Sequence, residues 1–275
     1  MTGATTGGRS GGVSMPGEDG DADPSLHDAP TLDLSVVVPY FNTGDRVRAT
    51  VDRLVAALNA SGRSFEVICV SDGSTDGSDA SLDTCDPHVV RRVCLPENRG
   101  KGEALRAGFQ LGRGRWIGFI DGDGDLPPEQ MSDLAAVAFD PASPRDVVLG
   151  SKLHPGSEVV YTPLRRLASW GWQQAVAVAF SLRVRDTQCG VKLFERQVLA
   201  EVLPLTRERR FAFDVELLVV ARHLGHRAFV EVPVRIEARR GSTVSLHAAA
   251  AMLADLAAIW WRLRIRHDYD RARRP

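Results

Sequence analysis

Three aspartates stand at alternate positions in the segment 121–125, Asp-Gly-Asp-Gly-Asp, directly after an apolar run. Alternate side chains of an extended chain point the same way, so the carboxylates of Asp121, Asp123 and Asp125 should gather on one side. Like charges this close need a cation or water between them, and hard divalent cations bind carboxylate oxygens while leaving room for phosphate oxygens. A solvated acidic turn is the alternative, because Asp and Gly are common in turns. The position at a strand end favours the metal site.

A second polar segment, 71–77 (Ser-Asp-Gly-Ser-Thr-Asp-Gly), also follows an apolar run. It imitates the opening of an EF-hand calcium loop, but a strand precedes it, and Asp83 stands where that motif has Glu. We therefore interpret the segment as a turn that leads into a helix. Asp76 or Ser78 is expected to cap that helix, and Asp72 is expected to face a ligand.

Lys101 lies between Gly100 and Gly102 at the start of a predicted helix, where a basic loop attracts phosphate. Two nucleotide-binding motifs do not fit the residues around it. Leu105 occupies the last Gly position of GxGxxG, and no Lys-Ser/Thr pair of a P-loop follows. A nucleotide-dependent dehydrogenase and a kinase are therefore disfavoured. The alternative, that 98–100 (Asn-Arg-Gly) is only a turn, is equally consistent with the sequence.

Short apolar runs that alternate with helical patterns must position these polar segments. This alternation predicts a doubly wound, mostly parallel α/β sheet with helices on both faces. Strands are expected at 34–39, 65–70, 89–95, 115–120, 146–151 and, at an edge because of Pro233, 229–236; helices are expected at 47–58, 102–111, from Pro128, and at 164–180, 213–224 and 244–266.

Ligands of open α/β sheets bind beyond the carboxyl ends of the strands. Polar segments follow the expected strand ends at 39–42, 71–72, 98–102 and 121–123. We therefore expect these segments to converge on one edge of the sheet.

The composition is that of a globular protein, with 275 residues, 44% hydrophobic and 25% charged. Its 34 basic and 35 acidic residues give a net charge of −1, so no nucleic acid is expected as a partner. The four cysteines form no CxxC and indicate reduced thiols of a cytosolic protein. The sequence contains no apolar run of about 18 residues, so no membrane span is predicted. Residues 1–31 lack an apolar signal segment and are expected to form a disordered tail.

Longer motifs carry a more specific signal than these single residues. They run in order from about Leu34 to about Arg266, and they are Val-Val-Val-Pro-Tyr-Phe-Asn at 36–42, Val-Ser-Asp-Gly-Ser-Thr-Asp at 70–76, Asn-Arg-Gly-Lys-Gly-Glu-Ala-Leu-Arg-Ala-Gly at 98–108, Asp-Gly-Asp at 121–123 and Pro-Pro-Glu at 127–129. In these motifs the chain resembles family-2 glycosyltransferases of the GT-A fold. Two further motifs, Asp-Thr-Gln-Cys-Gly-Val-Lys-Leu-Phe at 186–194 and Arg-Phe-Ala-Phe-Asp-Val-Glu-Leu-Leu at 210–218, resemble the dolichyl-phosphate glucosyltransferase branch of the polyprenyl-phosphate sugar synthases.

Three positions depart from the family pattern. Thr43 stands where the family has Glu, and Ser71 replaces the first Asp of Asp-Asp-Gly-Ser. Both changes weaken the expectation of nucleoside contacts at these two positions. Lys152 replaces the Arg of a Gly-Ser-Arg motif, which keeps the positive charge but loses the bidentate fork of Arg.

The resemblance implies an inverting transfer of glucose or mannose from a nucleotide sugar, UDP-glucose or GDP-mannose, to a polyprenyl phosphate. A phosphate oxygen is already ionised at neutral pH, so this nucleophile needs no strong base. Mg²⁺ or Mn²⁺ would neutralise the charge that develops on the leaving diphosphate. Two alternatives stay open: a soluble glycosyltransferase with a sugar or small-molecule acceptor, and an inactive module that binds a nucleotide sugar. The pair Asp121 and Asp123 disfavours the inactive module.

The resemblance also implies roles for individual residues. The metal would be held by Asp121, Asp123 and Asp125, the donor by Pro39, Tyr40, Asn42, Asp72, Lys101 and Asp121, and the acceptor phosphate by Lys152, Arg165 and Arg166; the candidate catalytic residues are Asp123, Asp214, Lys152 and Arg165. For Asp214 the alternative is helix capping, and for Arg165 and Arg166 it is an exposed helix face.

The sequence divides into the tail, a GT-A domain at 32–242, and a C-terminal amphipathic helix with a basic tail at 243–275. Steps of about 100° per residue place an apolar arc on one side of that helix and three charged residues opposite. The pattern fits a helix that lies on an anionic membrane surface, which would make the protein peripheral on the cytoplasmic face. An ordinary helix packed on the sheet is the alternative. The apolar arc is Leu246, Ala249, Ala250, Leu253, Leu256, Ala257 and Trp260; the charged residues are Asp255, Arg262 and Arg266; and Arg264 and His267 add to the positive charge.

Overall fold

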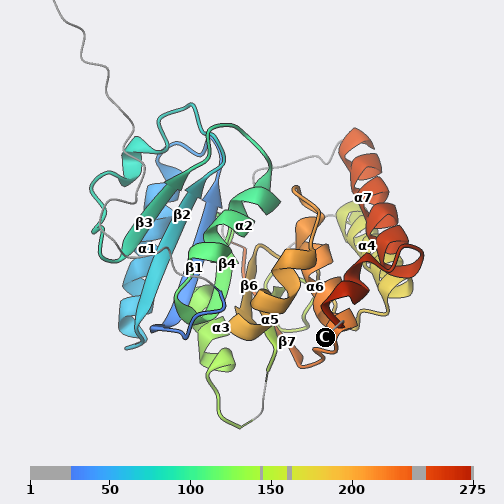
Figure 1. The fold of residues 1–275 in the computed structure, drawn as a ribbon. Coiled ribbons are helices and arrows are strands. Elements are labelled where there is room, and N and C mark those ends of the chain that lie inside the picture. The colour runs from blue at the N-terminus through green and yellow to red at the C-terminus, as the bar shows by residue number, and fades with distance from the viewer. Residues whose placement is uncertain (1–25, 143–144, 160–162, 237–245, 274–275) are drawn as a thin grey trace, which may run out of the picture.

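The computed structural model describes residues 26–142, 145–159, 163–236 and 246–273, but not the side chains of 163–168, 246–250 and 271–273. Within these ranges one seven-stranded sheet has the order β3-β2-β1-β4-β6-β5-β7 (Figure 1). Only β6 runs antiparallel to its neighbours, so the predicted mostly parallel sheet is confirmed. The strands are β1 (Leu32–Tyr40), β2 (Phe65–Ser71), β3 (Val90–Cys94), β4 (Gly114–Ile120), β5 (Val147–Ser151), β6 (Val191–Glu195) and β7 (Phe229–Pro233).

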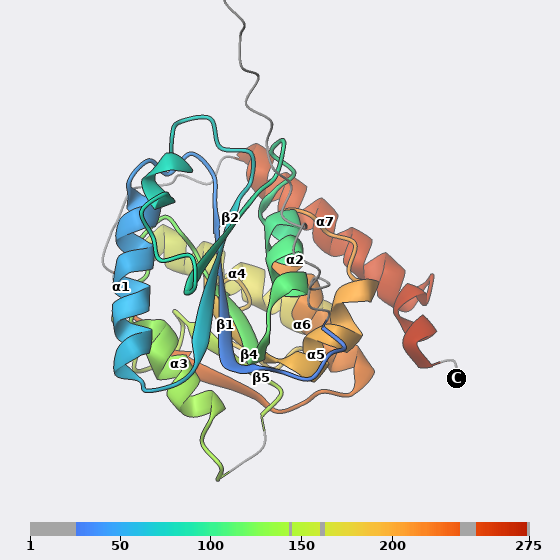
Figure 2. The same ribbon diagram turned by 60° about the vertical axis from the view of Figure 1, so that its left-hand side comes forward.

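Helices cover both faces of the sheet, as the doubly wound pattern predicts (Figure 2). On one face α1 and α3 pack, and on the other α2, α5 and α6 pack, with α4 and α7 beyond them. The helices are α1 (Arg46–Ala60), α2 (Lys101–Leu111), α3 (Gln130–Ala138), α4 (Pro163–Phe180), α5 (Arg196–Val202), α6 (Phe213–Leu224) and α7 (Leu246–Arg264), with short 3-10 helices η1 (Ala80–Leu82), η2 (Leu203–Leu205) and η3 (Asp268–Arg273).

Strand β1 explains why the apolar runs are continuous. Val36 and Val38 belong to the core under α1 and α3, whereas Val37 belongs to the core under α2. Because successive strand residues point to opposite faces, a strand buried on both sides needs apolar residues at every position. The edge position predicted for the Pro233 strand is also correct, since β7 ends the sheet.

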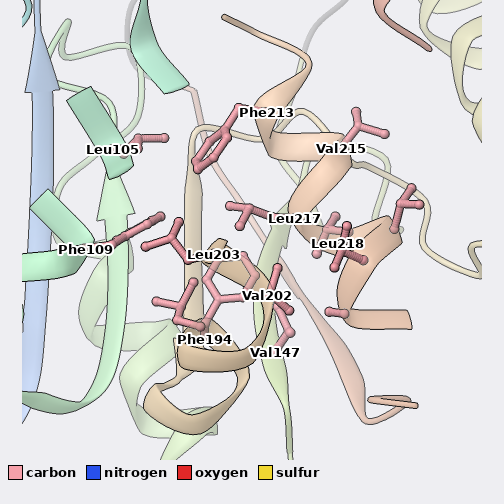
Figure 3. Close-up of a cluster of buried hydrophobic side chains, with 14 of the residues drawn as sticks. Leu105, Phe109, Val147, Phe194, Val202, Leu203, Phe213, Val215, Leu217 and Leu218 are labelled. Atoms are coloured by element: carbon pink, nitrogen blue, oxygen red, sulfur yellow. The ribbon is translucent and has the colours of Figure 1, made fainter. Parts of the chain in front are cut away.

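A phenylalanine cluster fixes the start of α6 against α2 and β6 (Figure 3). The ring centroid of Phe109 lies 6.3 Å from that of Phe194 and 6.5 Å from that of Phe213. All three side chains are fully buried, and such aromatic contacts add to the free energy gained by burial. The residue after Phe213 is Asp214, so this packing places a candidate catalytic carboxylate.

Two elements differ from the sequence expectation. Strand β6 and helix α5 were not predicted, because Lys192 interrupts the short apolar run of β6 and α5 has only seven residues.

The segment 26–31, which was expected to belong to the disordered tail, contacts the domain. Leu26 is buried in the core, and the carbonyl of Asp28 accepts a hydrogen bond from Arg196 at 3.0 Å. Residues 1–25 of that expected tail lie outside the described residues.

The C-terminal helix packs on the domain through one face. Leu256, Ile259 and Leu263 of α7 are buried in the core that also contains α6. Arg262, predicted as a surface cation, is ion-paired with Glu208 and Glu216 and is 14% exposed, so that prediction is wrong. None of the helices in the described ranges is both long and apolar enough to span a bilayer.

Candidate active site

The polar segments meet at the edge of the sheet where β1, β2, β4 and β5 end, which we call the carboxyl edge. The carbonyl of Tyr40 accepts a hydrogen bond from the Asp72 N–H at 2.9 Å. The Pro39 carbonyl accepts one from the Gly122 N–H at 3.3 Å. The predicted convergence of these segments on one edge is therefore confirmed.

Asp72 holds the loop in front of α2. Its two carboxylate oxygens accept hydrogen bonds from the backbone N–H groups of Arg99 and Gly100, at 2.8 and 2.9 Å. Charge-assisted bonds of this kind are strong, and the Asp72 side chain is buried. The carboxylate therefore positions the residue that follows, Lys101, and a direct contact of Asp72 with the donor stays a prediction.

The first motif forms a tight loop above β1. Asn42 has φ of 50°, and its side-chain oxygen accepts a hydrogen bond from the Thr75 N–H at 2.8 Å. Tyr40 is buried and donates its hydroxyl hydrogen to Asp79 at 2.8 Å, so its ring supports the loop from below. Contacts of Pro39, Tyr40 and Asn42 with a donor stay predictions.

Asp76 and Ser78 tie the second motif to the first instead of capping a helix. Asp76 accepts a hydrogen bond from the Gly44 N–H at 2.8 Å, and the Ser78 hydroxyl accepts one from the Thr43 N–H at 3.0 Å. The short helix η1 that follows has no side-chain cap. The capping interpretation is therefore wrong, because these oxygens satisfy loop N–H groups from the neighbouring strand end.

Lys101 lies between two of the predicted carboxylates. Its Nζ is 2.8 Å from Asp121 Oδ1 and 3.3 Å from Asp214 Oδ2. Burial alone would lower the pKa of Lys101, but the carboxylates of Asp121 and Asp214 outweigh it and raise that pKa. The site thus contains a permanent positive charge between two carboxylates. Lys101 and Asp214 are 113 positions apart in the sequence.

A second lysine, Lys192, contacts the Asp214 carboxylate from the buried side. The Nζ of the fully buried Lys192 lies 3.5 Å from Asp214 Oδ2 and donates a hydrogen bond to the Cys189 carbonyl at 2.6 Å. Asp214 stands in the first turn of α6 but makes no side-chain capping bond there. Its other oxygen, Oδ1, is buried without a hydrogen-bond partner in the described part of the chain. A buried acceptor of this kind is costly unless a ligand satisfies it.

Asp121 is fixed by a segment that sequence analysis did not assign to the site. Its N–H donates to the Gly190 carbonyl at 3.0 Å. A Cβ atom at Gly190 would overlap Asp121 Oδ2, so only glycine leaves room for this carboxylate. Gly190 and Lys192 both lie in the motif 186–194. A lysine inside an otherwise apolar run is the signal that could have revealed Lys192, because a buried ammonium must find a carboxylate.

The three aspartates of 121–125 offer oxygen ligands at the open side of the site. Asp123 is exposed, and its Oδ1 accepts a hydrogen bond from the Asp125 N–H at 3.1 Å. Asp121 is 31% exposed beside Lys101. Nowhere in the described ranges do three Asp, Glu, His or Cys residues enclose an ion by themselves. This donor set fits Mg²⁺ or Mn²⁺ whose remaining ligands come from a diphosphate or water.

Of the three residues predicted to hold the acceptor phosphate, the structure describes the side chain of Lys152. Lys152 directly follows β5 at the carboxyl edge, and its N–H donates to Asp186 Oδ2 at 2.9 Å. Asp186 also accepts a hydrogen bond from the Gln188 N–H at 3.0 Å, so Lys152 is tied to the 186–194 motif. Arg165 and Arg166 stand in α4, but their side chains lie outside the described residues.

One face of α7 is left exposed and apolar, and we call it the α7 face. It consists of Leu253, Ala257, Trp260, Trp261 and Arg264, together with Ile265, which directly follows the helix. Trp260 and Trp261 are 40% and 52% exposed, although tryptophan is usually more buried than that. Of the predicted apolar arc, Leu256 faces the core, and the side chains of Leu246, Ala249 and Ala250 lie outside the described residues.

Residues 35–203 match the family model described as "Glycosyl transferase family 2". The dolichyl-phosphate beta-glucosyltransferase of Drosophila melanogaster is 35% identical over 254 residues, which is 87% of this chain and 78% of the fly protein. The dolichyl-phosphate beta-glucosyltransferase of Homo sapiens is 32% identical over 225 residues, which is 77% of this chain and 68% of the human protein.

The fold is also similar to that of a solved glycosyltransferase. Glucosyl-3-phosphoglycerate synthase from Mycobacterium tuberculosis, in complex with Mn²⁺, UDP-glucose and phosphoglyceric acid, superimposes with a TM-score of 0.64 and 18% identity. The match covers 84% of this chain and 80% of that protein. At this identity the likeness establishes the shared GT-A fold.

Proposed function

The chain belongs to glycosyltransferase family 2, among the dolichyl-phosphate beta-glucosyltransferases, and from this premise we propose that it transfers glucose from UDP-glucose to a polyprenyl phosphate. The observation that carries the proposal is Lys101, held between Asp121 and Asp214 at the carboxyl edge. This arrangement combines a fixed cation with oxygen ligands, which the diphosphate of a nucleotide sugar requires. The M. tuberculosis relative was solved with UDP-glucose, which supports UDP as the nucleotide of the donor.

Each side chain of the cluster has a separate task in the proposed reaction. Lys101 carries positive charge toward the leaving diphosphate, and Lys192 contributes a second ammonium group beside Asp214. The unpaired Oδ1 of Asp214 can accept a hydrogen bond from a sugar hydroxyl and so orient the ring. The acceptor attacks with an ionised phosphate oxygen, so no residue has to remove a proton from it. A single displacement of this kind inverts the anomeric carbon.

Asp121, Asp123 and Asp125 would hold the divalent ion, because their oxygens line the open side of the site. When bound, the ion neutralises the charge that develops on the departing diphosphate. Mn²⁺ in the solved M. tuberculosis relative supports the use of a divalent ion in general.

We propose Lys152, together with Arg165 and Arg166, as the cations that hold the acceptor phosphate. Lys152 stands at the end of β5, on the same edge as Asp121, and its backbone is anchored to Asp186. Fixed cations beside a phosphate form strong charge-assisted hydrogen bonds and orient the attacking oxygen.

The α7 face is the proposed contact with the membrane. Tryptophans favour the interface between headgroups and acyl chains, and Arg264 at the end of this face attracts anionic lipid. A peripheral position on the cytoplasmic face would give the protein access to an acceptor that stays in the bilayer. Exposed Trp170 of α4 adds to the apolar surface.

The donor and acceptor are tested by incubation with radiolabelled UDP-glucose or GDP-mannose, polyprenyl phosphate and Mn²⁺. We expect label from UDP-glucose in the organic phase, and less from GDP-mannose. Label that stays in a water-soluble glycoside would establish the alternative, a glycosyltransferase with a small-molecule acceptor. Binding of UDP-glucose without any transfer would establish an inactive nucleotide-sugar module.

A further inference from the structure

A buried carboxylate joins the C-terminal segment to the start of α6. Glu216 is fully buried, and its Oε2 accepts hydrogen bonds from the N–H groups of Arg207 and Glu208, both at 2.7 Å. Its Oε1 accepts a hydrogen bond from the Tyr269 hydroxyl at 2.6 Å and lies 3.3 Å from Arg262. One carboxylate therefore binds a loop on one side and the end of the chain on the other.

The C-terminal partners are fixed in turn. Arg262 also pairs with Glu208, and its Nε donates to the Ala258 carbonyl at 3.1 Å. Tyr269 is fully buried, and burial together with the Glu216 carboxylate raises the pKa of its hydroxyl, which stays a donor. A buried carboxylate without these donors would carry an uncompensated charge.

The loop held by Glu216 supports the start of α2. The Arg209 carbonyl accepts a hydrogen bond from the Glu103 N–H at 3.2 Å. A Cβ atom at Gly102 would lie 2.7 Å from the Cβ of Phe213 and 2.8 Å from the carbonyl carbon of Arg209. Because the contact leaves no spare room, a shift of this loop must displace the start of α2 or the start of α6.

The two helix starts carry the charges of the candidate site. Lys101 precedes Gly102, and Asp214 follows Phe213, and these two side chains form the 3.3 Å ion pair. Asp214 lies two residues before Glu216 on α6. The chain of contacts therefore runs from Arg262 and Tyr269 through Glu216 to Lys101, the partner of Asp121, and to Asp214.

We propose that Arg262 and Tyr269 are positioning residues, which hold Lys101 and Asp214 in place through Glu216 and the loop 207–212. The inference rests on the proposed transferase function, which it deepens by making the C-terminal segment part of the active site. It also ties the helix that bears the α7 face to the catalytic charges.

The test compares two variants that each lose a buried hydroxyl. Tyr269→Phe removes the bond to Glu216, and Ser35→Ala removes a bond of equal length, 2.6 Å, from Ser35 to the buried Glu66. Ser35→Ala also removes the bonds that the Ser35 hydroxyl accepts from the N–H groups of Arg113 and Gly114, at 3.0 and 2.7 Å. Ser35 lies near the start of β1, at the opposite edge of the sheet. Ser35→Ala should lose at least as much thermal stability as Tyr269→Phe, so it is the control for a purely structural effect.

We expect Tyr269→Phe to lower kcat about tenfold, with KM for UDP-glucose changed less than about twofold. Ser35→Ala should leave kcat close to that of the wild type. Arg262→Met should lower kcat at least as much, and Arg262→Lys should recover part of the loss because it keeps the charge. Equal kcat in Tyr269→Phe and the wild type, or equal losses in Tyr269→Phe and Ser35→Ala, would overturn the proposal.

Hydrogen exchange provides a readout that needs no turnover. In Tyr269→Phe the amides of 99–105 and 207–217 should exchange faster than in the wild type, whereas in Ser35→Ala they should not. If no acceptor supports transfer by the wild type, the proposed function fails, and exchange at 99–105 still decides whether the network reaches Lys101. Unchanged exchange at 99–105 would refute positioning even if Arg262→Met failed to fold.

Discussion

Lys101 and Lys192 balance the charges of Asp121 and Asp214, so the remaining negative charge of the candidate site lies on Asp123 and Asp125. No ion pair of these two residues occurs within the described ranges. Two uncompensated carboxylates match the charge of one divalent cation, which is the electrostatic argument for the proposed metal.

At the residue scale, Asp123 is the position where loss of metal binding can be separated from loss of packing. Asp123→Asn keeps the shape of an exposed side chain, and we expect kcat to fall by at least about two orders of magnitude, or about 2.7 kcal/mol. Mn²⁺ binding followed by electron paramagnetic resonance should weaken in parallel, and excess chelator should abolish transfer. Asp133→Asn, which changes an exposed acid on α3, is the control. Full activity of Asp123→Asn would exclude this residue as a metal ligand.

Gly190 tests whether the position of Asp121 matters. Gly190→Ala puts a methyl group against Asp121 Oδ2, and we expect kcat/KM to fall about tenfold or more because the carboxylate must move. Gly171→Ala on α4 is the matched control, since its Cβ atom would meet nothing within 4 Å. Steady-state kinetics of both variants, with circular dichroism to confirm folding, gives the comparison. Equal kinetics would mean that Asp121 tolerates displacement.

Lys152 tests the acceptor side of the site. Lys152→Ala should raise KM for polyprenyl phosphate about tenfold while KM for UDP-glucose changes little, because a charge-assisted bond to phosphate is lost. Kinetics with each substrate varied in turn measures the split. Equal increases for both substrates would assign Lys152 to the donor or to folding.

At the scale of elements, α7 presents two different faces. Leu256, Ile259 and Leu263 on one face are buried in the core that also contains α6, while the α7 face exposes adjacent tryptophans. The sequence arc alone did not separate these faces, because small and large apolar residues surround most of the helix. Burial of Arg262 further removes one of the charges that had been assigned to lipid binding.

We expect the double variant Trp260→Ser, Trp261→Ser to lose flotation with vesicles that contain phosphatidylglycerol, while it stays folded. The loss should follow from the apolar surface that no longer enters the interface. Arg115→Gln, which removes an exposed charge on β4, is the control and should float as the wild type does. If the wild type fails to float at low salt, the α7 face is not a membrane contact.

At the scale of the whole molecule, the C-terminal segment completes one of the two cores. Leu256, Ile259, Leu263 and Tyr269 are all buried in the core formed by α2, α5 and α6. Removing them would expose the apolar surface of α6 and leave Glu216 without two of its partners. The division expected at residue 242 thus separates segments that share a core.

A chain truncated after Ser242 should therefore unfold at a temperature at least about 10 °C lower, or without a cooperative transition, since several buried side chains are lost at about 2 kcal/mol or more each. A thermal melt followed by circular dichroism measures this. A truncated chain that melts like the full chain would show that α7 is a separate appendage. Residual binding of UDP-glucose would show how much of the donor site survives.

Local sequence determined the elements that position most of the site. The continuous apolar runs gave the central parallel strands, since burial on both faces demands them, and the ends of these runs located Asp72, Lys101 and Asp121 on one edge. The family motifs added Asp214. These features follow from the few residues around each position, which is why they can be recognised without a fold.

Tertiary structure alone decided which polar side chains pair with one another. Lys101 meets Asp214 across 113 residues, and Tyr269 meets Glu216 across 53. Neither pairing affects the local periodicity, because an ion pair or a hydrogen bond needs only two side chains that the packed helices bring together. The antiparallel β6, with Lys192 as its second residue, gave no strand signal for the same reason. Its buried lysine is tolerated only because Asp214 and the Cys189 carbonyl contact the ammonium group.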